Sequence, residues 1–290
     1  MFVRWASVLL LSVLTMSVAA AEGDYQSAVV LGQYTDSDRD SDYTANSLGY
    51  YYYLYEVKPD GVPLAEAEYL KRVSSINVNY IETESSSPVY LDTKGQRYSL
   101  SFDSRNPESD FTYHINYYNN DTDYFNSSDA RVGSINYQRY RVDVGYYVAQ
   151  NTNVSFGYTK YKKKSDVFSL TYTSSDRYTI SAKHMILNGD STAWKFYAYI
   201  TRVSYANSEN NRSQGMYMNY YISPRYNFGG GIEISGGSNE FNNGIYEEIN
   251  GSAFFTPTFF VGFAMAKFKA DNTAVRNDDD IMSISAGFRF

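Results

Sequence analysis

The sequence predicts an all-β protein: a transmembrane, antiparallel, up-and-down β-barrel of about 14 strands with both termini in the periplasm. Three observations predict this fold class. The C-terminal end alternates apolar and polar residues, the N-terminal end carries a hydrophobic leader, and the composition is rich in Tyr and Phe. Counts of 12 or 16 strands are the alternatives, because such barrels have an even number of strands.

The N-terminal 21 residues have the layout of a secretory signal peptide. Arg4 precedes an apolar stretch from Trp5 to Val18, and three small residues, Ala19 to Ala21, stand before Glu22. A charged start, a short apolar centre and small residues at the cleavage site define such signals. A membrane anchor, the alternative, needs about 20 apolar residues. We expect cleavage that removes residues 1–21 and leaves residues 22–290 as a single barrel domain.

The last ten residues form an amphipathic strand. The side chains that share its apolar face are Met282, Ile284, Ala286, Phe288 and Phe290. A period of two with one apolar face is a strand signal, and in a bilayer only a closed barrel satisfies the backbone groups of a strand. The pattern, with its terminal Phe, resembles the assembly signal of Gram-negative outer-membrane barrels. That resemblance implies recognition by the outer-membrane barrel assembly machinery.

The composition agrees with this class. With 32 Tyr, 17 Phe and 2 Trp, 18% of the residues are aromatic, and two interfacial girdles of a barrel would use them. Mean hydropathy is only -0.46, as expected when inward polar residues dilute outward apolar ones. The absence of Cys excludes disulfides and thiol catalysis. Without Arg4, 24 basic residues face 32 acidic ones, a net charge near -8 that argues against a nucleic-acid partner.

Alternation recurs along the mature chain and predicts fourteen strands. Their expected ranges are Tyr25–Tyr34, Ser47–Val57, Ser74–Glu82, Gln96–Ser104, Asp110–Tyr118, Gln138–Ala149, Asn153–Lys163, Asp176–Leu187, Thr192–Tyr205, Gln214–Ser223, Tyr226–Ser235, Gly244–Thr256, Phe259–Ala270 and Ile281–Phe290. A soluble sandwich would also alternate, but its polar face would carry more Lys and Glu and fewer Tyr.

The connections are of two kinds, which sets the direction of the strands. Short turns at Gln150–Asn153, Ser223–Arg225 and Thr256–Thr258 are predicted to be periplasmic, since these barrels have short periplasmic turns and long outer loops. The outer loops are then expected at Thr35–Asn46, Asn119–Ser134, Asn207–Ser213, Gly236–Asn243 and Asp271–Asp280.

Two segments do not fit simple alternation of strand and loop. Val167–Thr173 alternates well enough to be a strand, but counting it breaks the parity, so we interpret it as an extension of a neighbouring strand above the membrane. Pro59–Arg72 is the only stretch with helical character, and parity places it on the periplasmic side as a linker or short lid. Its sequence from Pro63 to Leu70, Pro-Leu-Ala-Glu-Ala-Glu-Tyr-Leu, resembles a recurring segment of uncharacterised porins of gammaproteobacteria.

Enzymatic barrels of the outer membrane need His with Ser or Asp, and this chain has two His. Strand parity directs His114 inward and His184 outward. Neither has an Asp or Ser two residues away on its own strand; a partner on a neighbouring strand stays open, because barrel sites are assembled from several strands. We interpret both His as structural and expect no catalytic residues.

Two further motifs are weighed as binding sites. The acidic run at residues 35–42 begins like a calcium loop, but Ser41 and Ser47 stand where the sharp-turn Gly and the bidentate Glu belong. A solvated outer loop is the preferred interpretation, with divalent-cation binding as the alternative. Gly229 to Gly231 would suit a phosphate loop only if a helix followed, and a barrel strand uses Gly where aromatic side chains cover it. No metal and no cofactor are expected.

We therefore expect a porin-like passive diffusion channel for small hydrophilic solutes and ions in the cell outer membrane. Inward charges of both signs suit a water-filled pore, and about 14 strands leave a lumen that holds water. The predicted pore-lining residues are Asp103, His114, Arg139, Arg141, Asp143, Lys195 and Glu233. A monomer is favoured over a trimer, with outer-membrane lipids and lipopolysaccharide as partners. The alternatives are a barrel enzyme that acts on lipid or peptide, and a surface-structural or adhesin barrel.

Overall fold

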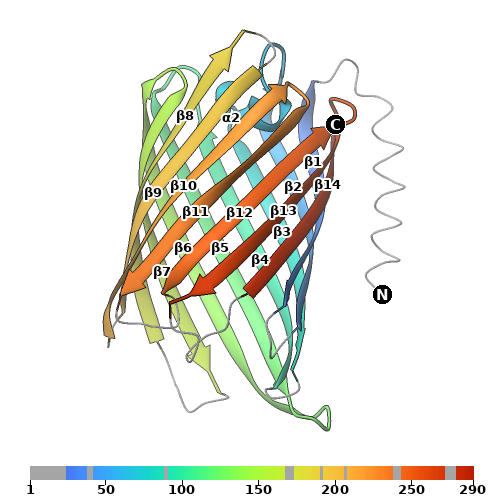
Figure 1. The fold of residues 1–290 in the computed structure, drawn as a ribbon, viewed down its shortest axis with the longest axis vertical. Coiled ribbons are helices and arrows are strands. Elements are labelled where there is room, and N and C mark those ends of the chain that lie inside the picture. The colour runs from blue at the N-terminus through green and yellow to red at the C-terminus, as the bar shows by residue number, and fades with distance from the viewer. Residues whose placement is uncertain are drawn as a thin grey trace.

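The computed structural model describes residues 24–37, 42–87, 91–166, 173–189, 192–205, 208–237, 243–271 and 279–290. Its fourteen strands form one closed barrel in which each strand pairs antiparallel with its neighbours in sequence (Figure 1). The first and last strands close the ring, and Val29 pairs with Phe288 at that seam. The predicted antiparallel, up-and-down β-barrel and its number of 14 strands are confirmed.

The strands lie at or close to the predicted positions. They are β1 Tyr25–Ser37, β2 Asp42–Val57, β3 Ser75–Ser86, β4 Asp92–Arg105, β5 Phe111–Phe125, β6 Arg131–Ala149, β7 Thr152–Ser165, β8 Thr173–Asn188, β9 Thr192–Tyr205, β10 Ser208–Ser223, β11 Tyr226–Gly237, β12 Gly244–Phe254, β13 Phe259–Ala270 and β14 Asp279–Arg289.

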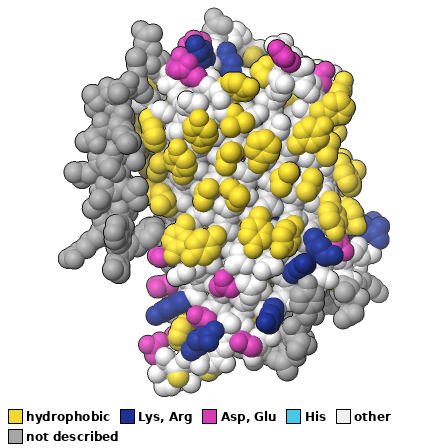
Figure 2. Space-filling view, turned by 180° about the vertical axis from the view of Figure 1, so that it is seen from behind, with side chains coloured by type: hydrophobic (Ala, Val, Ile, Leu, Met, Phe, Trp, Pro, Cys, Tyr) yellow, Lys and Arg dark blue, Asp and Glu magenta, His cyan; other side chains and the backbone are white. Residues whose placement is uncertain are grey.

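The outer surface carries a broad apolar belt between two charged rims (Figure 2). The strand alternation produces it: Met282 and Ile284 of β14 are 50% and 49% exposed, whereas Arg289 on the opposite face is buried. Exposed apolar side chains in a continuous belt of this kind suit a lipid environment. Within the described residues, no helix combines the length and the apolar character needed to cross a bilayer.

One rim holds the described ends of the chain, where Phe290 accepts backbone hydrogen bonds from Gln26 and Ser27. We call it the terminal rim and the opposite one the loop rim. At the loop rim the strands run into segments predicted as loops. The loop prediction for Asn119–Ser134 is wrong over most of its length, since β5 continues to Phe125 and β6 begins at Arg131. Beyond the lipid both faces of a strand can be polar, so the alternation that marks a strand disappears there.

The inward face carries much of the aromatic content that the sequence assigned to interfacial girdles. Inward-facing Tyr include Tyr51 and Tyr53 on β2 and Tyr217 and Tyr221 on β10, while the alternate positions Tyr50 and Tyr52 are exposed outward. Glycine makes room for some of these rings. A Cβ on Gly231 would lie 2.1 Å from the Tyr217 ring, so this glycine makes room for the ring, and the glycine run lies within strand β11 with no helix after it among the described residues.

Residues 58–74 join β2 to β3 at the terminal rim and fold into the barrel end; we call them the inner segment. They contain a 3-10 turn, Leu64–Glu66, followed directly by the short helix α2, Ala67–Leu70 (Figure 1). The predicted helical character is confirmed. The predicted signal peptide, the alternating stretch 167–172 and half of the acidic motif (residues 38–41) lie outside the described residues.

Candidate functional site

The inner segment begins with a tight turn that directs the chain inward. Val62 donates a backbone hydrogen bond to the Pro59 carbonyl at 3.2 Å, and Gly61 within that turn has a φ of +70°. Glycine adopts this left-handed conformation without the steric penalty of a side chain. The turn delivers Leu64 to the β10–β11 connection, where its amide donates to the Pro224 carbonyl at 2.9 Å.

Glu66 anchors the inner segment to one wall. Its carboxylate accepts hydrogen bonds from Lys183 at 2.6 Å, from Lys195 at 2.7 Å and from the hydroxyl of Tyr221 at 2.7 Å. These three groups come from β8, β9 and β10, and Glu66 itself is buried. Two ammonium groups and a phenol therefore satisfy a carboxylate that water does not reach.

Glu68, in α2, anchors the inner segment to the other wall. One of its oxygens accepts from Tyr25 at 2.8 Å, from Tyr53 at 3.0 Å and from Arg289 at 3.1 Å. Arg289 also donates to the Leu64 carbonyl at 2.9 Å. These wall residues belong to β1, β2 and β14, and β2 lies opposite β9 in the ring of strands. Two carboxylates spaced by one residue thus tie α2 across the lumen.

Apolar packing reinforces both anchors. Ala67 is buried against Tyr25, Ala28, Tyr53 and Val57 on the side of β1 and β2. Tyr69 packs with Tyr147, Met185, Ala193 and Tyr221 on the other side. The inner segment thus contributes to two clusters of buried hydrophobic residues, with Ala67 and Val73 in one and Tyr69 in the other. Burial of a large side chain contributes about 1.5–3 kcal/mol, so the segment is held by packing as well as charge.

Two cation–π contacts complete the docking. The Lys183 ammonium lies 3.6 Å from the centre of the Tyr69 ring, and the Arg72 guanidinium lies 3.9 Å from that of Tyr147. Arg72 also donates to Asp110 in the β4–β5 turn at 3.2 Å. The Tyr69 hydroxyl is buried and makes no hydrogen bond to a described residue, and burial raises the pKa of this phenol.

The charge of Glu66 makes the docking dependent on pH. Burial opposes ionisation of this carboxyl, but the Lys183 and Lys195 ammonium groups outweigh burial and lower its pKa from 4.5 to about 2. A carboxyl with a depressed pKa contributes its full stabilisation above its ordinary value and loses it as the pH falls towards the shifted one. We predict that the inner segment stays docked from pH 7 to pH 5 and is released only below about pH 4.5. Hydrogen exchange of residues 58–74 over this range checks it, and release already between pH 7 and pH 6 would contradict the role of Glu66.

Between the loop rim and the inner segment, three cavities follow one another along β1 to β6, and β12 to β14 also line the third. The first, about 410 Å³, begins at Tyr34 and Asp36; the second, about 270 Å³, shares Ser47, Ile81 and Arg97 with it. The third, about 420 Å³, shares Val30 and Tyr51 with the second and reaches Ala65 and Glu68 of the inner segment. The shared walls make these cavities neighbours in one path that ends beside α2.

Of the predicted pore-lining residues, Asp103 lines the third of these cavities and Arg139 the second. Asp103 lies 3.0 Å from the His114 Nδ1 atom and 3.3 Å from Arg105. Arg141 and Asp143 form a wall ion pair at 2.7 Å. The cross-strand partner that sequence reasoning left open for His114 is thus Asp103, whereas exposed His184 contacts Thr152 at 2.8 Å. No Ser or Thr hydroxyl among the described residues bonds to His114, so a nucleophile–base pair is not assembled there.

The other three predicted residues differ in whether a group of opposite charge binds them. Arg139 donates to Asn116 at 3.0 Å and lies 4.7 Å from the Tyr118 ring centre, with no carboxylate bound to it among the described residues. Glu233 accepts a hydrogen bond from Tyr199. Lys195 is held by Glu66, so its charge is compensated beneath the inner segment.

Sequence reasoning missed several inward charges. Arg97 lines two of the three cavities and donates to Tyr43 at 3.1 Å. Its inward direction follows from the outward parity of Tyr98 and Leu100, so the signal was present. Glu66 and Glu68 gave no such signal, since a short helix between strands does not reveal whether it enters the lumen.

The closed antiparallel ring, the apolar belt and the charged interior define the fold of an outer-membrane β-barrel. The Acinetobacter baumannii outer membrane protein Omp33 has a similar structure, with a TM-score of 0.60 and 20% identity over 93% of this chain and 100% of that chain. The Pseudomonas putida toluene transporter TodX gives 0.55 and 10% over 94% and 90%. The Ralstonia pickettii toluene transporter TbuX gives 0.54 and 9% over 93% and 90%. No protein-family model and no curated protein matches the sequence.

Proposed function

We propose that this protein is a passive diffusion channel for small hydrophilic solutes and ions across the outer membrane, with the terminal rim in the periplasm. The observation that carries the proposal is the row of connected cavities from the loop rim to the inner segment, lined by charged and polar side chains such as Arg97, Arg139 and Asp103. Such a lining replaces part of the hydration of a polar solute.

The comparisons support a channel-type barrel. TodX is described as a toluene transporter and CymD as a monoaromatic hydrocarbon channel, and both share the fold. The charged lumen of this chain favours a hydrophilic solute over a hydrocarbon. In the proposed channel the inner segment sets the narrowest point, and solutes pass beside it through the third cavity, which lies between the inner segment and the wall formed by β1 to β4 and β12 to β14.

The test is to record purified protein in planar bilayers. We expect stepwise, ohmic conductance that persists when His114 is replaced by Ala, because His114 serves as a wall partner of Asp103. A sham preparation from cells that lack the protein is the control. Absence of conductance in both the wild type and a variant without the inner segment would overturn the channel. Hydrolysis of lipid or peptide that His114→Ala abolishes would favour an enzyme instead.

A further inference from the structure

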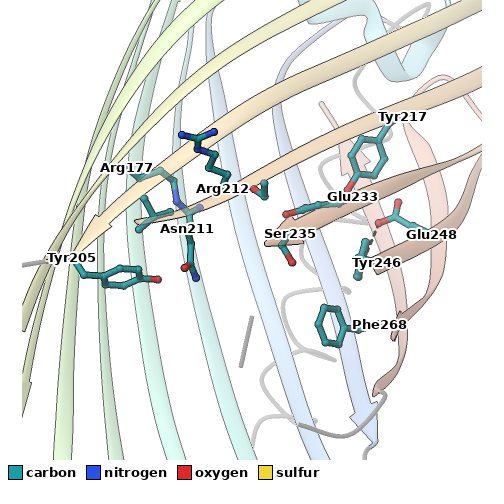
Figure 3. Close-up of a pocket in the computed structure, with 12 residues that line it drawn as sticks. Arg177, Tyr205, Asn211, Arg212, Tyr217, Glu233, Ser235, Tyr246, Glu248 and Phe268 are labelled. Atoms are coloured by element: carbon teal, nitrogen blue, oxygen red, sulfur yellow. Dashed lines mark hydrogen bonds between the residues drawn. The ribbon is translucent and has the colours of Figure 1, made fainter. Parts of the chain in front are cut away.

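A fourth cavity, about 500 Å³, shares no lining residue with the three cavities described above and has a different chemistry (Figure 3). It is lined from β8 to β13, and its walls combine aromatic rings with two carboxylates. Arg177, Tyr217, Glu233, Tyr246, Glu248 and Phe268 are the lining residues on which the inference depends.

The aromatic part is a cluster of Tyr rings held against the wall. The Tyr199 and Tyr217 rings are nearly parallel, with an interplanar angle of 14° and centroids 6.4 Å apart. A Cβ on Gly215 would lie 2.7 Å from the Tyr199 ring, and one on Gly231 would lie 2.1 Å from the Tyr217 ring. Each ring therefore packs against a glycine of the next strand, and Tyr217 also lines the cavity. The face of an aromatic ring carries the negative end of its quadrupole.

The acidic part adjoins these rings. Glu233 of β11 accepts from Tyr199, and Glu248 of β12 accepts from Tyr246 at 3.1 Å and from Asn250 at 2.8 Å. Within the part of the chain that the structure describes, no Lys or Arg forms an ion pair with either carboxylate. Two carboxylates that neutral donors hold in place thus keep their charge available to a cation in the cavity.

The opposite side of the cavity is basic. Arg177 of β8, which lies 5.1 Å from the Tyr161 ring centre, and Arg212 of β10 both line the cavity, and Figure 3 shows Arg177 across from Glu233 and Glu248. A cation entering the cavity is repelled at that side and attracted at the other. Aromatic faces with carboxylates beside them are the surroundings in which proteins hold organic ammonium groups.

We propose that this cavity binds a small organic cation, with its ammonium group between Glu233, Glu248 and the face of Tyr217 and its other end towards Arg177. The inference rests on the proposed channel function, because the lumen gives the solute its access to the cavity. It adds a substrate class, since a channel with this site favours ammonium-bearing solutes over neutral ones of the same size.

The experiment is titration calorimetry of the full-length protein in detergent with choline and with its neutral isostere, 3,3-dimethylbutan-1-ol. We expect choline to bind at least about tenfold more tightly than the isostere, which corresponds to about 1.4 kcal/mol. The double variant Glu233→Gln, Glu248→Gln should lose this preference, and Tyr217→Leu should weaken choline binding about tenfold.

Glu247→Gln is the matched control, because Glu247 is the neighbour of Glu248 on β12, is exposed on the other face and pairs with Lys269. It should bind choline as the wild type does. Equal affinity for choline and the isostere, or unchanged binding in the double variant while heat-modifiable folding is retained, would overturn the site. Choline binding by protein that shows no conductance would support the binding site and contradict the channel function. Conductance in protein that does not bind choline would support the channel function and contradict the binding site.

Discussion

Replacing Glu66 with Ala is expected to increase single-channel conductance several-fold, because it releases the inner segment from the wall. The substitution leaves the ammonium groups of Lys183 and Lys195, whose side chains are 24% and 23% exposed, without their carboxylate. Removal of one partner of a fully buried ion pair costs about 3–5 kcal/mol, and water offsets part of that cost at these partly exposed lysines, so we expect the ratio of released to docked segment to shift by about tenfold or more. Recordings of the variant beside the wild type measure the effect. Adding Glu68→Ala should increase it further, since that residue holds the opposite wall.

Glu108→Ala is the matched control for this variant. Glu108 lies in an exposed turn at the same terminal rim and forms no ion pair with a described residue, so its conductance should stay at the wild-type value. Heat-modifiable folding of each variant separates a released segment from a misfolded barrel. If the folded Glu66→Ala, Glu68→Ala variant conducts no better than the wild type, the inner segment does not limit passage.

The second large effect is expected on selectivity, from Arg139→Gln. Arg139 lines the middle cavity and has no carboxylate partner among the described residues, so its charge acts on passing ions. A unit positive charge about 6 Å away in water raises the energy of a cation and lowers that of an anion by about 0.7 kcal/mol each, which changes the cation-to-anion permeability ratio about tenfold. Removing it should shift the reversal potential in a salt gradient towards cations. Arg97→Gln, in the same cavity, should act in the same direction.

Arg131→Gln provides the comparison on the same strand. Arg131 is exposed at the loop rim and is paired with Asp123 at 2.8 Å, and charges there are screened over a Debye length of about 10 Å at 0.1 M salt. Its reversal potential should differ little from that of the wild type, and the same holds for the exposed loop-rim carboxylate Asp280. A larger shift from Arg131→Gln than from Arg139→Gln would locate the selectivity at the mouth of the barrel.

Most of the barrel could be predicted from sequence because lipid imposes a period of two on each strand. Residues such as Met216, Met218 and Ile222 alternate with inward polar ones along β10, and a bilayer tolerates no other arrangement. Predictions of strand ends failed at the loop rim, where Asn119 to Asp123 continue β5 without any apolar face. The ladder of backbone hydrogen bonds continues there because the neighbouring strand continues as well.

The interior could be predicted only in part. Strand parity directs Arg139 and Glu233 inward. It does not predict that the Tyr199 hydroxyl donates a hydrogen bond to Glu233 or that no described carboxylate binds Arg139, because those contacts depend on the register between strands. The docking of Glu66 on Lys183 and Lys195 joins residues more than a hundred positions apart. Nothing in the local pattern at Glu66 encodes that pairing. The Tyr content was equally ambiguous, because Tyr suits both an interface girdle and a polar lumen.

The most direct test of the channel uses the absence of Cys in this chain. Two variants each carry a single Cys, one at Ser99 and one at its neighbour Leu100. Ser99 lines the second cavity, whereas Leu100 is exposed on the outer surface, so the two Cys side chains lie on opposite faces of β4. During bilayer recording, a charged, water-soluble thiol reagent is added. The channel predicts a stepwise fall in conductance for Ser99→Cys and no change for Leu100→Cys. Unchanged conductance in both variants, with Ser99→Cys shown to be modified, would contradict passage of ions through this lumen.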